Sequence, residues 1–481
     1  MAEPQRNGIA SDLRRILGSG SVADQPASMS RYTGDALGPY RAFSAADRLR
    51  ATPSVVVFPE GARQISRVLR YAQQQSVPVV PYGGGTGVFG AATPIEGCVV
   101  LSLDRLNGIL DISPQDFTAR LQAGVVLDNA ARALHGKNML LGHDPWSRPI
   151  ATVGGAISTD GVGYTAARYG SMGEQVLGVE AVLADGEIIR ARANAKPTNG
   201  LPLQHLFIGM EGTFGVVSEA TLRVFPQPQT RLIAGVDFPT FEAGFHAICR
   251  LYAEGMRPTM IDYGTDADIA NSPESDSSPA DEDATLYIAF EGFTEDVRTQ
   301  WQKTLDICRE YDGIEGSREE ALAFWHNRHA PGERYKRSVL QSANPVEARR
   351  DAASARVDYL HVALPTSRVL DYRKRCMGIF ANSGVKVREW SIWARPEFLS
   401  FLIAQEQDAQ TDDYTGDMGQ VVDAVLSLAQ RMGGSMEYCH GVGLKLAHLA
   451  EAEHGSGLQM MRRLKRVIDS NNILNPGKLL G

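Results

Sequence analysis

The stretch Pro81-Tyr82-Gly83-Gly84-Gly85-Thr86-Gly87-Val88-Phe89-Gly90 holds five glycines in ten residues. The preceding run, Ser76-Val77-Pro78-Val79-Val80, predicts a buried strand. A strand that ends in a glycine-rich loop leaves backbone N–H groups that can point in one direction, and such a nest binds phosphate oxygens without a positive side chain. Glycine is needed there because a Cβ would block close approach and because some positions need φ > 0. The stretch therefore predicts a phosphate-binding loop.

The segment 85–90 also fits the pattern G-x-G-x-x-G of dinucleotide-binding Rossmann domains. In those domains a helix follows the loop directly, because the helix N-terminus holds the pyrophosphate. Here Pro94 and Gly97 follow, and then the apolar run 98–103, which predicts a loop and a strand. The sequence therefore favours the phosphate-binding loop and argues against a Rossmann fold.

The composition indicates a globular protein with more than one domain. The chain has 481 residues and a net charge of −8, which argues against a general nucleic-acid binder. No apolar run approaches the ~20 residues that span a bilayer, and the first 30 residues lack the apolar core of a signal peptide. Five scattered cysteines without a C-x-x-C pair indicate a reducing compartment. We expect a cytoplasmic protein, associated with a membrane only through a partner, and leave a homodimer open.

Hydrophobic periodicity predicts alternating strands and helices over the first 228 residues. Residues 62–75 carry apolar side chains at i, i+3, i+4 and i+7, starting from Ile65, which predicts a helix between strands at 53–59 and 77–80. Further predicted elements are strands at 98–103, 118–121 and 176–183, a helix at 127–135, and a hairpin turn at 184–187. Two more glycine-rich segments lie at 152–163 and 206–222.

The pattern changes after Pro226 and Pro228. Amphipathic stretches now alternate with strands, which indicates an α+β domain with an antiparallel sheet. The predicted strands are 232–238, 285–290, 359–364 and 385–393, and the predicted helices are 241–253, 294–311 and 417–432. Residues 266–283 hold seven acidic residues and no Lys or Arg, which predicts a solvated loop.

Three glycine-rich segments in this order, with the ending Ile473-Leu474-Asn475-Pro476-Gly477-Lys478, resemble the vanillyl-alcohol oxidase/PCMH flavoprotein superfamily. Within it, the sequence resembles the branch of FAD-linked oxidases that includes the glycolate oxidase flavin subunit, bacterial D-lactate dehydrogenases and alkyl-dihydroxyacetonephosphate synthase. The resemblance implies an α+β fold: a PCMH-type FAD-binding domain of two α/β subdomains, and an α+β cap domain with an antiparallel sheet. The expected parts are an N-terminal arm at 1–50, the FAD-binding domain at 51–228, the cap at 229–431, and a C-terminal segment at 432–481 that returns to the FAD domain.

The same resemblance implies that FAD binds along the three glycine-rich segments. Each glycine run alone would more often be a turn, and their joint order favours a cofactor site. No histidine lies between Pro81 and Gly90, so we expect non-covalent FAD. The implied cofactor-binding residues are Pro81, Tyr82, Gly83, Gly84, Gly85, Thr86 and Gly87 at the pyrophosphate; Asp144, Thr152, Gly154, Gly155 and Ser158 beside the flavin and ribityl chain; Glu211, Gly212, Gly215, Val216 and Val217 on the adenine side; and Asn475 in the tail.

The sequence departs from the family at the positions that hold a metal. Many hydroxy-acid dehydrogenases of this branch carry a histidine-rich cap strand and a glutamate before a His-Gly pair. Here the corresponding strand, 385–395, has no histidine, and Cys439 precedes His440-Gly441. A metal site needs several convergent ligands, so we expect no metal. The cap strand instead offers two aromatic walls, Trp390 and Trp393.

The resemblance implies a two-electron oxidation of a CH–OH group, with hydride transfer to flavin N5 and His440 as the candidate base. Tyr438 is its neighbouring alternative. A carboxylate substrate requires a guanidinium group, for which Arg334 and Arg337 are favoured over Arg328, Arg388 and Arg395. We expect a small substrate, most readily a 2-hydroxy acid, and an aromatic or aliphatic alcohol is the alternative. A flavin-binding subunit that only transfers electrons is the non-catalytic alternative. Oxygen, a quinone or an electron-transfer protein would accept the electrons.

Overall fold

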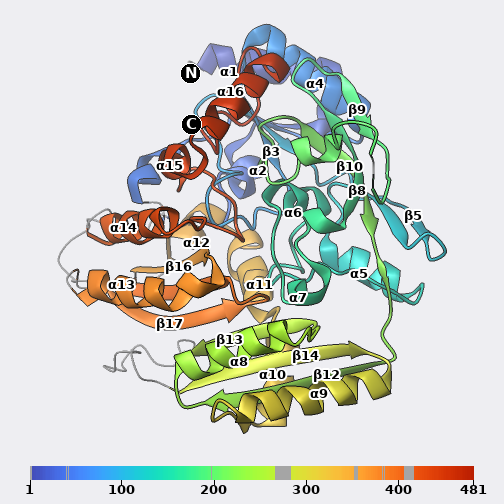
Figure 1. Cartoon of the computed structure of the whole chain (residues 1–481). Coiled ribbons are helices and arrows are strands. Elements are labelled where there is room, and N and C mark those ends of the chain that lie inside the picture. The colour runs from blue at the N-terminus through green and yellow to red at the C-terminus, as the bar shows by residue number, and fades with distance from the viewer. Residues whose placement is uncertain are drawn as a thin grey trace.

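The computed structural model of the chain describes residues 3–38, 41, 43–196, 198–265, 283–351, 356–381, 383, 385–405 and 417–481. The predicted acidic loop 266–283 lies outside these residues, apart from its last position. Figure 1 shows two smaller sheets in the upper part of the molecule and a larger sheet with flanking helices below them.

The first sheet carries the first glycine-rich loop at the end of its strand β3. Its strands lie in the order β1 (Val22–Ala23), β2 (Val55–Val57), β4 (Val99–Ser102) and β3 (Val79–Tyr82). β2, β4 and β3 are parallel, which requires a crossover connection, and helix α4 (Ala62–Gln75) provides it. The apolar stripe predicted on this helix is buried against the sheet.

The second sheet is antiparallel, in the order β5 (Ile109–Ser113), β6 (Thr118–Gln122), β10 (Val216–Arg223), β8 (Val176–Val182) and β9 (Ile188–Ala191). The predicted hairpin turn joins β8 to β9. Helix α5 (Leu127–His135) follows β6, and helix α6 (Val153–Thr159) packs against β10. The second glycine-rich segment therefore forms a short helix rather than an open loop.

The cap sheet is antiparallel and runs β15 (Ile314–Glu315), β12 (Thr230–Phe238), β14 (Ala284–Gly292), β13 (Met260–Thr265), β17 (Lys386–Trp393), β18 (Phe398–Gln405) and β16 (Arg356–Ala363). Its apolar face is covered by helices α8 (Phe241–Ala253), α9 (Thr294–Arg309), α13 (Val369–Ala381) and α14 (Asp417–Arg431). The opposite face contributes residues to the cleft described below.

The remaining helices connect these parts. They are α1 (Glu3–Leu17), α2 (Pro26–Met29), α7 (Ala166–Tyr169), α10 (Arg318–Asn327), α11 (Ala330–Tyr335), α12 (Pro345–Asp351), α15 (Ala450–His454) and α16 (Ser456–Ile468). A two-stranded pair, β7 (Met139–Leu140) and β11 (Phe225–Pro226), lies near the boundary between the halves.

Both ends of the chain are built into the first sheet. Ile9 and Leu13 of α1 are buried in the same apolar core as α4, and β1 extends the sheet, so the N-terminal region packs against this part of the molecule. The C-terminal tail pairs with β3, because the Val79 amide donates to Ile473 O (2.7 Å) and the Asn475 amide donates to Val79 O (2.9 Å). β1 and the C-terminal tail therefore lie at opposite edges of this sheet, and the tail runs beside β3, the strand that leads into the first glycine-rich loop.

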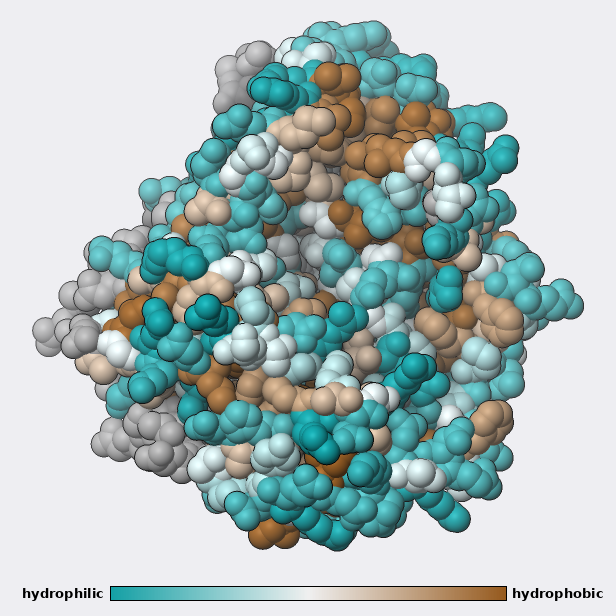
Figure 2. Space-filling model, in the orientation of Figure 1, coloured by the Kyte–Doolittle hydropathy of each residue, from teal (hydrophilic) through white to brown (hydrophobic). Residues whose placement is uncertain are grey.

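The face of the molecule drawn in Figure 2 is mainly hydrophilic, with hydrophobic residues gathered mostly toward its top. In the part of the chain that the structure describes, no helix has the length and apolar character needed to cross a bilayer.

Candidate active site

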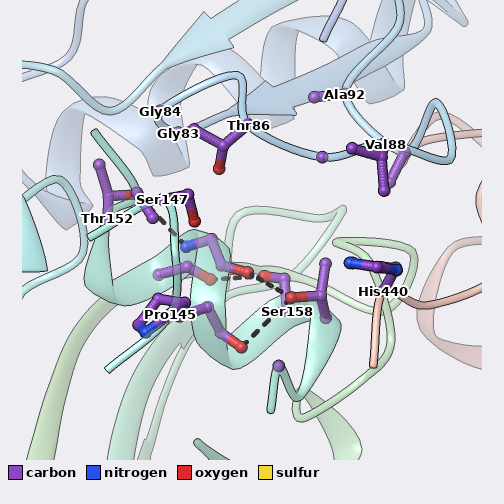
Figure 3. Close-up of a pocket in the computed structure, with 18 of the residues that line it drawn as sticks. Gly83, Gly84, Thr86, Val88, Ala92, Pro145, Ser147, Thr152, Ser158 and His440 are labelled. Atoms are coloured by element: carbon purple, nitrogen blue, oxygen red, sulfur yellow. Dashed lines mark hydrogen bonds between the residues drawn. The ribbon is translucent and has the colours of Figure 1, made fainter. Parts of the chain in front are cut away.

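A cleft of about 1480 Å³, open solvent at its mouth included, lies between the FAD-binding half and the cap. All three glycine-rich segments, the cap strands β13 and β17, and the segment around His440 contribute to its wall. In Figure 3 the first glycine-rich loop lies above α6, and His440 lies at one end of the space between them.

The first glycine-rich loop presents free backbone donors to this cleft. Among the described residues, the amides of the five positions from Gly83 to Gly87 donate to no protein atom. Buried backbone N–H groups are rarely left without a partner. A row of such groups on a cleft wall is the donor set that binds phosphate oxygens. The loop therefore fits the pyrophosphate of FAD.

Glycine is required in this loop mainly because neighbouring protein atoms approach it closely. A Cβ on Gly84 would lie 2.4 Å from Ile150 O, and one on Gly83 would lie 2.6 Å from Thr152 Oγ1. Gly85 has φ +68°, and its Cβ would lie 2.1 Å from the Tyr82 hydroxyl. The loop is therefore pressed against the segment before α6, which brings the first two glycine-rich segments together.

Helix α6 presents small residues and hydroxyl groups to the opposite side of the cleft. Thr152 caps the helix through its Oγ1, which accepts from the Gly155 amide (3.4 Å). Gly154 packs on Ala123, where an added Cβ would lie 2.7 Å from the alanine Cβ. Ser158 donates to Gly154 O (2.8 Å) and lines the cleft.

Glu211 links the third glycine-rich segment to the segment that carries His440. Its Oε1 accepts from the amides of Val442 (2.6 Å) and Gly443 (2.9 Å). Burial raises the pKa of Glu211 to about 7, although the Gly443 and Val442 amides act in the opposite direction. The side-chain amide of Asn475 donates to Glu211 O (2.6 Å) and to Ala91 O (2.9 Å). The carboxylate of Glu211 thus binds protein backbone, while the residue also lines the cleft.

His440 lines the cleft beside a buried carboxyl group. Glu437 Oε1 accepts from the amides of Cys439 (2.6 Å) and His440 (2.8 Å), and lies 3.9 Å from His440 Nδ1. Phe89 packs its ring against His440 with a centroid separation of 5.5 Å, and His361 lies 4.5 Å from His440 by the same measure. Nδ1 is buried without a hydrogen bond to any residue that the structure describes, which leaves Nε2 as the nitrogen available to a ligand.

His440 is neutral at ordinary pH. Burial, together with the charges of Arg41 and Lys445, lowers its pKa to about 3. These two cations share one carboxylate, because Arg41 Nε lies 2.8 Å from Asp358 Oδ1 and Lys445 Nζ lies 2.5 Å from Asp358 Oδ2. The cluster therefore carries one excess positive charge next to the imidazole.

Most polar side chains on the cleft-facing side of the cap sheet are paired with one another. The Tyr359 hydroxyl donates to Glu389 Oε1 (2.5 Å). Ser400 Oγ bonds both His361 Nδ1 (2.7 Å) and the Tyr438 hydroxyl (2.6 Å). Burial and the neighbouring His440 hold the pKa of His361 well below its ordinary value. This network fixes the rings that surround His440.

Asp262 and Trp393 also belong to this face. They are directly opposite each other on β13 and β17, so their side chains point to the same side of the sheet. Both line the cleft. Burial and the nearby Glu389 raise the pKa of Asp262 to about 8.

Of the expected cofactor-binding residues, sixteen line the cleft and two do not. The exceptions are Asp144 and Asn475; those that line the cleft are Pro81, Tyr82, Gly83, Gly84, Gly85, Thr86, Gly87, Thr152, Gly154, Gly155, Ser158, Glu211, Gly212, Gly215, Val216 and Val217. Tyr82 has its hydroxyl turned away, toward Arg31 O (3.1 Å) and Gly34 O (3.0 Å). Asn475 joins loops of the FAD-binding half through the two side-chain bonds given above.

Asp144 is the centre of an ion cluster rather than part of the cleft wall. Its carboxylate accepts from Arg148 (2.8 Å), Arg328 (2.8 Å) and His329 (2.8 Å). Burial would raise the pKa of Asp144, but the His329 hydrogen bond and the charge of Arg328 outweigh it and hold that pKa below its ordinary value. Arg328, one of the candidate carboxylate-binding arginines, is therefore already paired with Asp144.

The two favoured arginines, Arg334 and Arg337, do not lie at the cleft. Both are exposed. The segment that carries them buries Gly332 and Val339 instead, and a Cβ on Gly332 would lie 2.6 Å from Trp146 O. Arg334 and Arg337 therefore lie on the side of this segment that faces away from the protein interior.

Two aromatic expectations also need correction. Trp390 is fully buried in the core on the other face of the cap sheet, where it packs on Phe401 with a centroid separation of 4.8 Å, so only Trp393 forms a cleft wall. Tyr438 stacks on Phe398 at 4.3 Å and is absent from the cleft lining.

Two residues that the sequence did not single out lie at this site: Asp262 lines the cleft, and His361 lies beside His440. Both are on strands without a local motif, so only the sheet pairing brings them there. His143, next to the expected Asp144, also lines the cleft. Within the described ranges no cluster of three or more His, Cys, Asp or Glu residues is arranged to hold a metal ion.

Comparisons with known proteins agree with this architecture. Residues 53–192 match the family described as "FAD binding domain", and residues 227–479 match "FAD linked oxidases, C-terminal domain". The chain is 28% identical to the glycolate oxidase subunit GlcD of Bacillus subtilis (strain 168), covering 91% of each chain. It is 28% identical to D-lactate dehydrogenase of Archaeoglobus fulgidus, covering 89% of this chain and 91% of the relative.

Solved structures show the same fold at lower identity. p-Cresol methylhydroxylase with bound substrate superposes with a TM-score of 0.77 at 18% identity, over 100% of this chain and 97% of the other. An alkyldihydroxyacetonephosphate synthase gives 0.72 at 20% identity, over 98% and 86%. The chain belongs to the FAD-linked oxidases, and the two family matches identify it as an FAD-dependent oxidoreductase.

Proposed function

We propose that the cleft oxidises the CH–OH group of a small substrate, most readily a 2-hydroxy acid, with His440 as the base. The observation that carries this proposal is a neutral imidazole on the cleft wall, with Nδ1 toward Glu437 and Nε2 free. Relatives named as glycolate oxidase subunit, D-lactate dehydrogenase and D-2-hydroxyglutarate dehydrogenase support the 2-hydroxy acid.

His440 would accept the hydroxyl proton at Nε2 as the C–H bond breaks. The amides of Gly83 to Gly87 would hold the pyrophosphate of FAD, and α6 with the 211–217 segment would enclose the rest of the cofactor. When bound, FAD supplies the acceptor for the hydride that leaves the carbon. The hydrophobic and aromatic walls formed by Trp146, Val162 and Trp393 would exclude water from the reacting atoms.

An aromatic or aliphatic alcohol is the second candidate substrate. It is favoured by the outward position of Arg334 and Arg337, which leaves the cleft without the guanidinium that those two residues were expected to supply. Oxygen, a quinone or an electron-transfer protein would then reoxidise the flavin, as for the hydroxy acid.

Anaerobic flavin bleaching tests the proposal. The holoenzyme is mixed with both enantiomers of several 2-hydroxy acids and with a set of aliphatic and benzylic alcohols, and absorbance near 450 nm is followed. Bleaching by 2-hydroxy acids at low concentration supports the proposal, and bleaching by alcohols alone supports the second candidate. Failure of every compound to bleach the flavin would contradict both, and would leave a subunit that only transfers electrons. A parallel series with a chelator tests the expectation that no divalent metal is required.

A further inference from the structure

Two polar groups on the cap wall of the cleft lack partners, whereas their neighbours are paired. Asp262 makes no hydrogen bond through its carboxyl group to any residue that the structure describes. The indole Nε1 of Trp393 is buried and has no partner among the described residues. A buried polar group without a partner is unfavourable, whereas Asp262 is only half-buried. A ligand that bonded both groups would therefore supply the partners that these residues lack.

These groups are close together and face the same space. Asp262 and Trp393 are a directly opposed pair on two antiparallel strands, whose Cβ atoms are typically about 5 Å apart. Both line the cleft that also contains His440. When the reacting hydroxyl group of a substrate contacts His440, the rest of the substrate must lie against this wall or against the flavin.

The chemistry of the pair selects the group that completes it. Trp393 Nε1 can only donate a hydrogen bond, and Asp262 accepts when ionised and can donate when protonated. An ammonium group cannot accept from the indole, and a carboxylate fits only while Asp262 is protonated, because the ionised form repels it. A hydroxyl group both donates and accepts, so it satisfies Trp393 together with Asp262 in either protonation state.

We propose that Asp262 and Trp393 form a subsite for a second hydroxyl group of the substrate, so that the preferred substrates are polyhydroxy compounds. This inference rests on the proposed function and narrows its substrate class. The ring of Trp393, which lines the cleft, provides an apolar surface on which the C–H face of such a compound can lie. A 2-hydroxy acid with a hydroxyl on C3 and a simple diol both meet the requirement.

The test compares two pairs of compounds that differ by one hydroxyl group. The first pair is lactate (2-hydroxypropanoate) and glycerate (2,3-dihydroxypropanoate), each as both enantiomers. The second pair is 1-propanol and 1,2-propanediol. The second-order rate constant of anaerobic flavin reduction is measured for each compound with the FAD-loaded enzyme.

The wild-type enzyme should favour the dihydroxy member of a reactive pair by about 10-fold or more, because the monohydroxy compound leaves the buried Trp393 Nε1 and the half-buried Asp262 carboxyl group without a partner. In Asp262→Ala this preference should fall to near unity, and Asp262→Asn and Trp393→Phe should each reduce it in part. Asp237→Asn, on an exposed position of β12, is the matched control and should retain the full preference.

A wild-type preference at or below unity would overturn the inference, and so would a preference that survives in flavin-loaded Asp262→Ala and Asp262→Asn. Absence of flavin reduction by all compounds is a different result, because it contradicts the proposed oxidation itself. Flavin content, read from the 450 nm absorbance of each variant, separates a lost subsite from a lost cofactor.

Discussion

Single residues decide how closely the first glycine-rich loop approaches its neighbours. At Gly85 the limiting contact is the Tyr82 hydroxyl, 2.1 Å from an ideal Cβ, and the backbone there has φ +68°. Tyr82 cannot move easily, because it is fully buried and donates to Gly34 O (3.0 Å). A side chain at position 85 would therefore clash with Tyr82 and displace the loop, and phosphate binding would be weakened only as a result of that displacement.

We predict that Gly85→Val abolishes FAD binding. The side chain would strain a left-handed backbone and force the loop away from Tyr82, so the free amides would no longer point to one spot. The measurement is the ratio of 450 nm to 280 nm absorbance after purification. Gly378→Ala, on α13 with open space around its Cβ, should keep a normal ratio. Normal flavin content in Gly85→Val would show that the loop is only a turn.

The pH profile of flavin reduction should show no loss of rate near neutral pH that is caused by protonation of His440. An ordinary imidazole is protonated below a pH of about 6.5 and could then accept no proton. Burial and the charges of Arg41 and Lys445 lower the pKa of His440 to about 3, so its basic form persists as pH falls from 7 to 5. We predict that protonation of His440 does not lower the rate constant of flavin reduction between pH 7 and pH 5. An acid limb near pH 6.5 that disappears in His440→Ala would contradict this.

At the scale of elements, the ion cluster of Asp144 ties the FAD-binding half to the cap. Asp144 lies in the loop before α6, whereas Arg328 and His329 lie between α10 and α11. Arg328 is stacked over the Trp325 ring at 3.6 Å, and its side chain is only 11% exposed. Removal of the carboxylate would leave that buried guanidinium without its counter-charge.

We predict that Asp144→Ala lowers the free energy of unfolding by about 3 kcal/mol, the usual cost of an uncompensated buried charge. Since the folded pKa of Asp144 is depressed, its contribution is present above its unfolded value of 3.8 and is lost as pH falls below it. Urea denaturation at pH 7 and pH 3 measures both effects. Asp371→Asn removes an exposed pair with Arg375 and should cost less than 1 kcal/mol. Equal losses for the two variants would show that the cluster does not join the halves.

At the scale of the whole molecule, the cofactor site is assembled from segments that are far apart in the sequence. Glu211 accepts from Val442 and Gly443, and the C-terminal tail pairs with Val79 beside the first loop. Glycine-rich segments could be found from the sequence because their composition is unusual. Helices α4, α5 and α8 have the predicted bounds, because each carries a clear apolar stripe.

The cap wall of the site could not be predicted in the same way. Asp262 and His361 lie on strands β13 and β16, where no local spacing distinguishes a cleft-facing polar residue from a solvent-facing one. Only the strand order and register bring them to Trp393 and His440. The prediction that Arg334 or Arg337 binds a substrate carboxylate was wrong for a related reason. Both residues suit a carboxylate by type, but the packing of Gly332 turns the two side chains outward.

We predict that acid or heat releases all of the flavin as FAD. The first glycine-rich loop has no histidine that could bond the flavin. His143 lines the cleft, and its Nδ1 has no partner among the described residues. It is therefore the candidate attachment site if the flavin proves to be covalently bound. The supernatant and pellet of a trichloroacetic acid precipitation are compared by fluorescence. Yellow colour retained in the pellet would contradict non-covalent binding, and its loss in His143→Ala would identify the attachment site.

The central claim is that a flavin cleft with His440 as its base oxidises a CH–OH group. Its most direct test is stopped-flow flavin reduction, without oxygen, at saturating concentration of a compound that bleaches the wild-type enzyme. His440→Ala should retain FAD and reduce it roughly 10²–10⁴-fold more slowly, the usual effect of a positioned general base. His448→Ala, which removes a surface histidine paired with Asp423, should react at the normal rate. A flavin-loaded His440→Ala variant that is reduced at nearly the wild-type rate would contradict the claim.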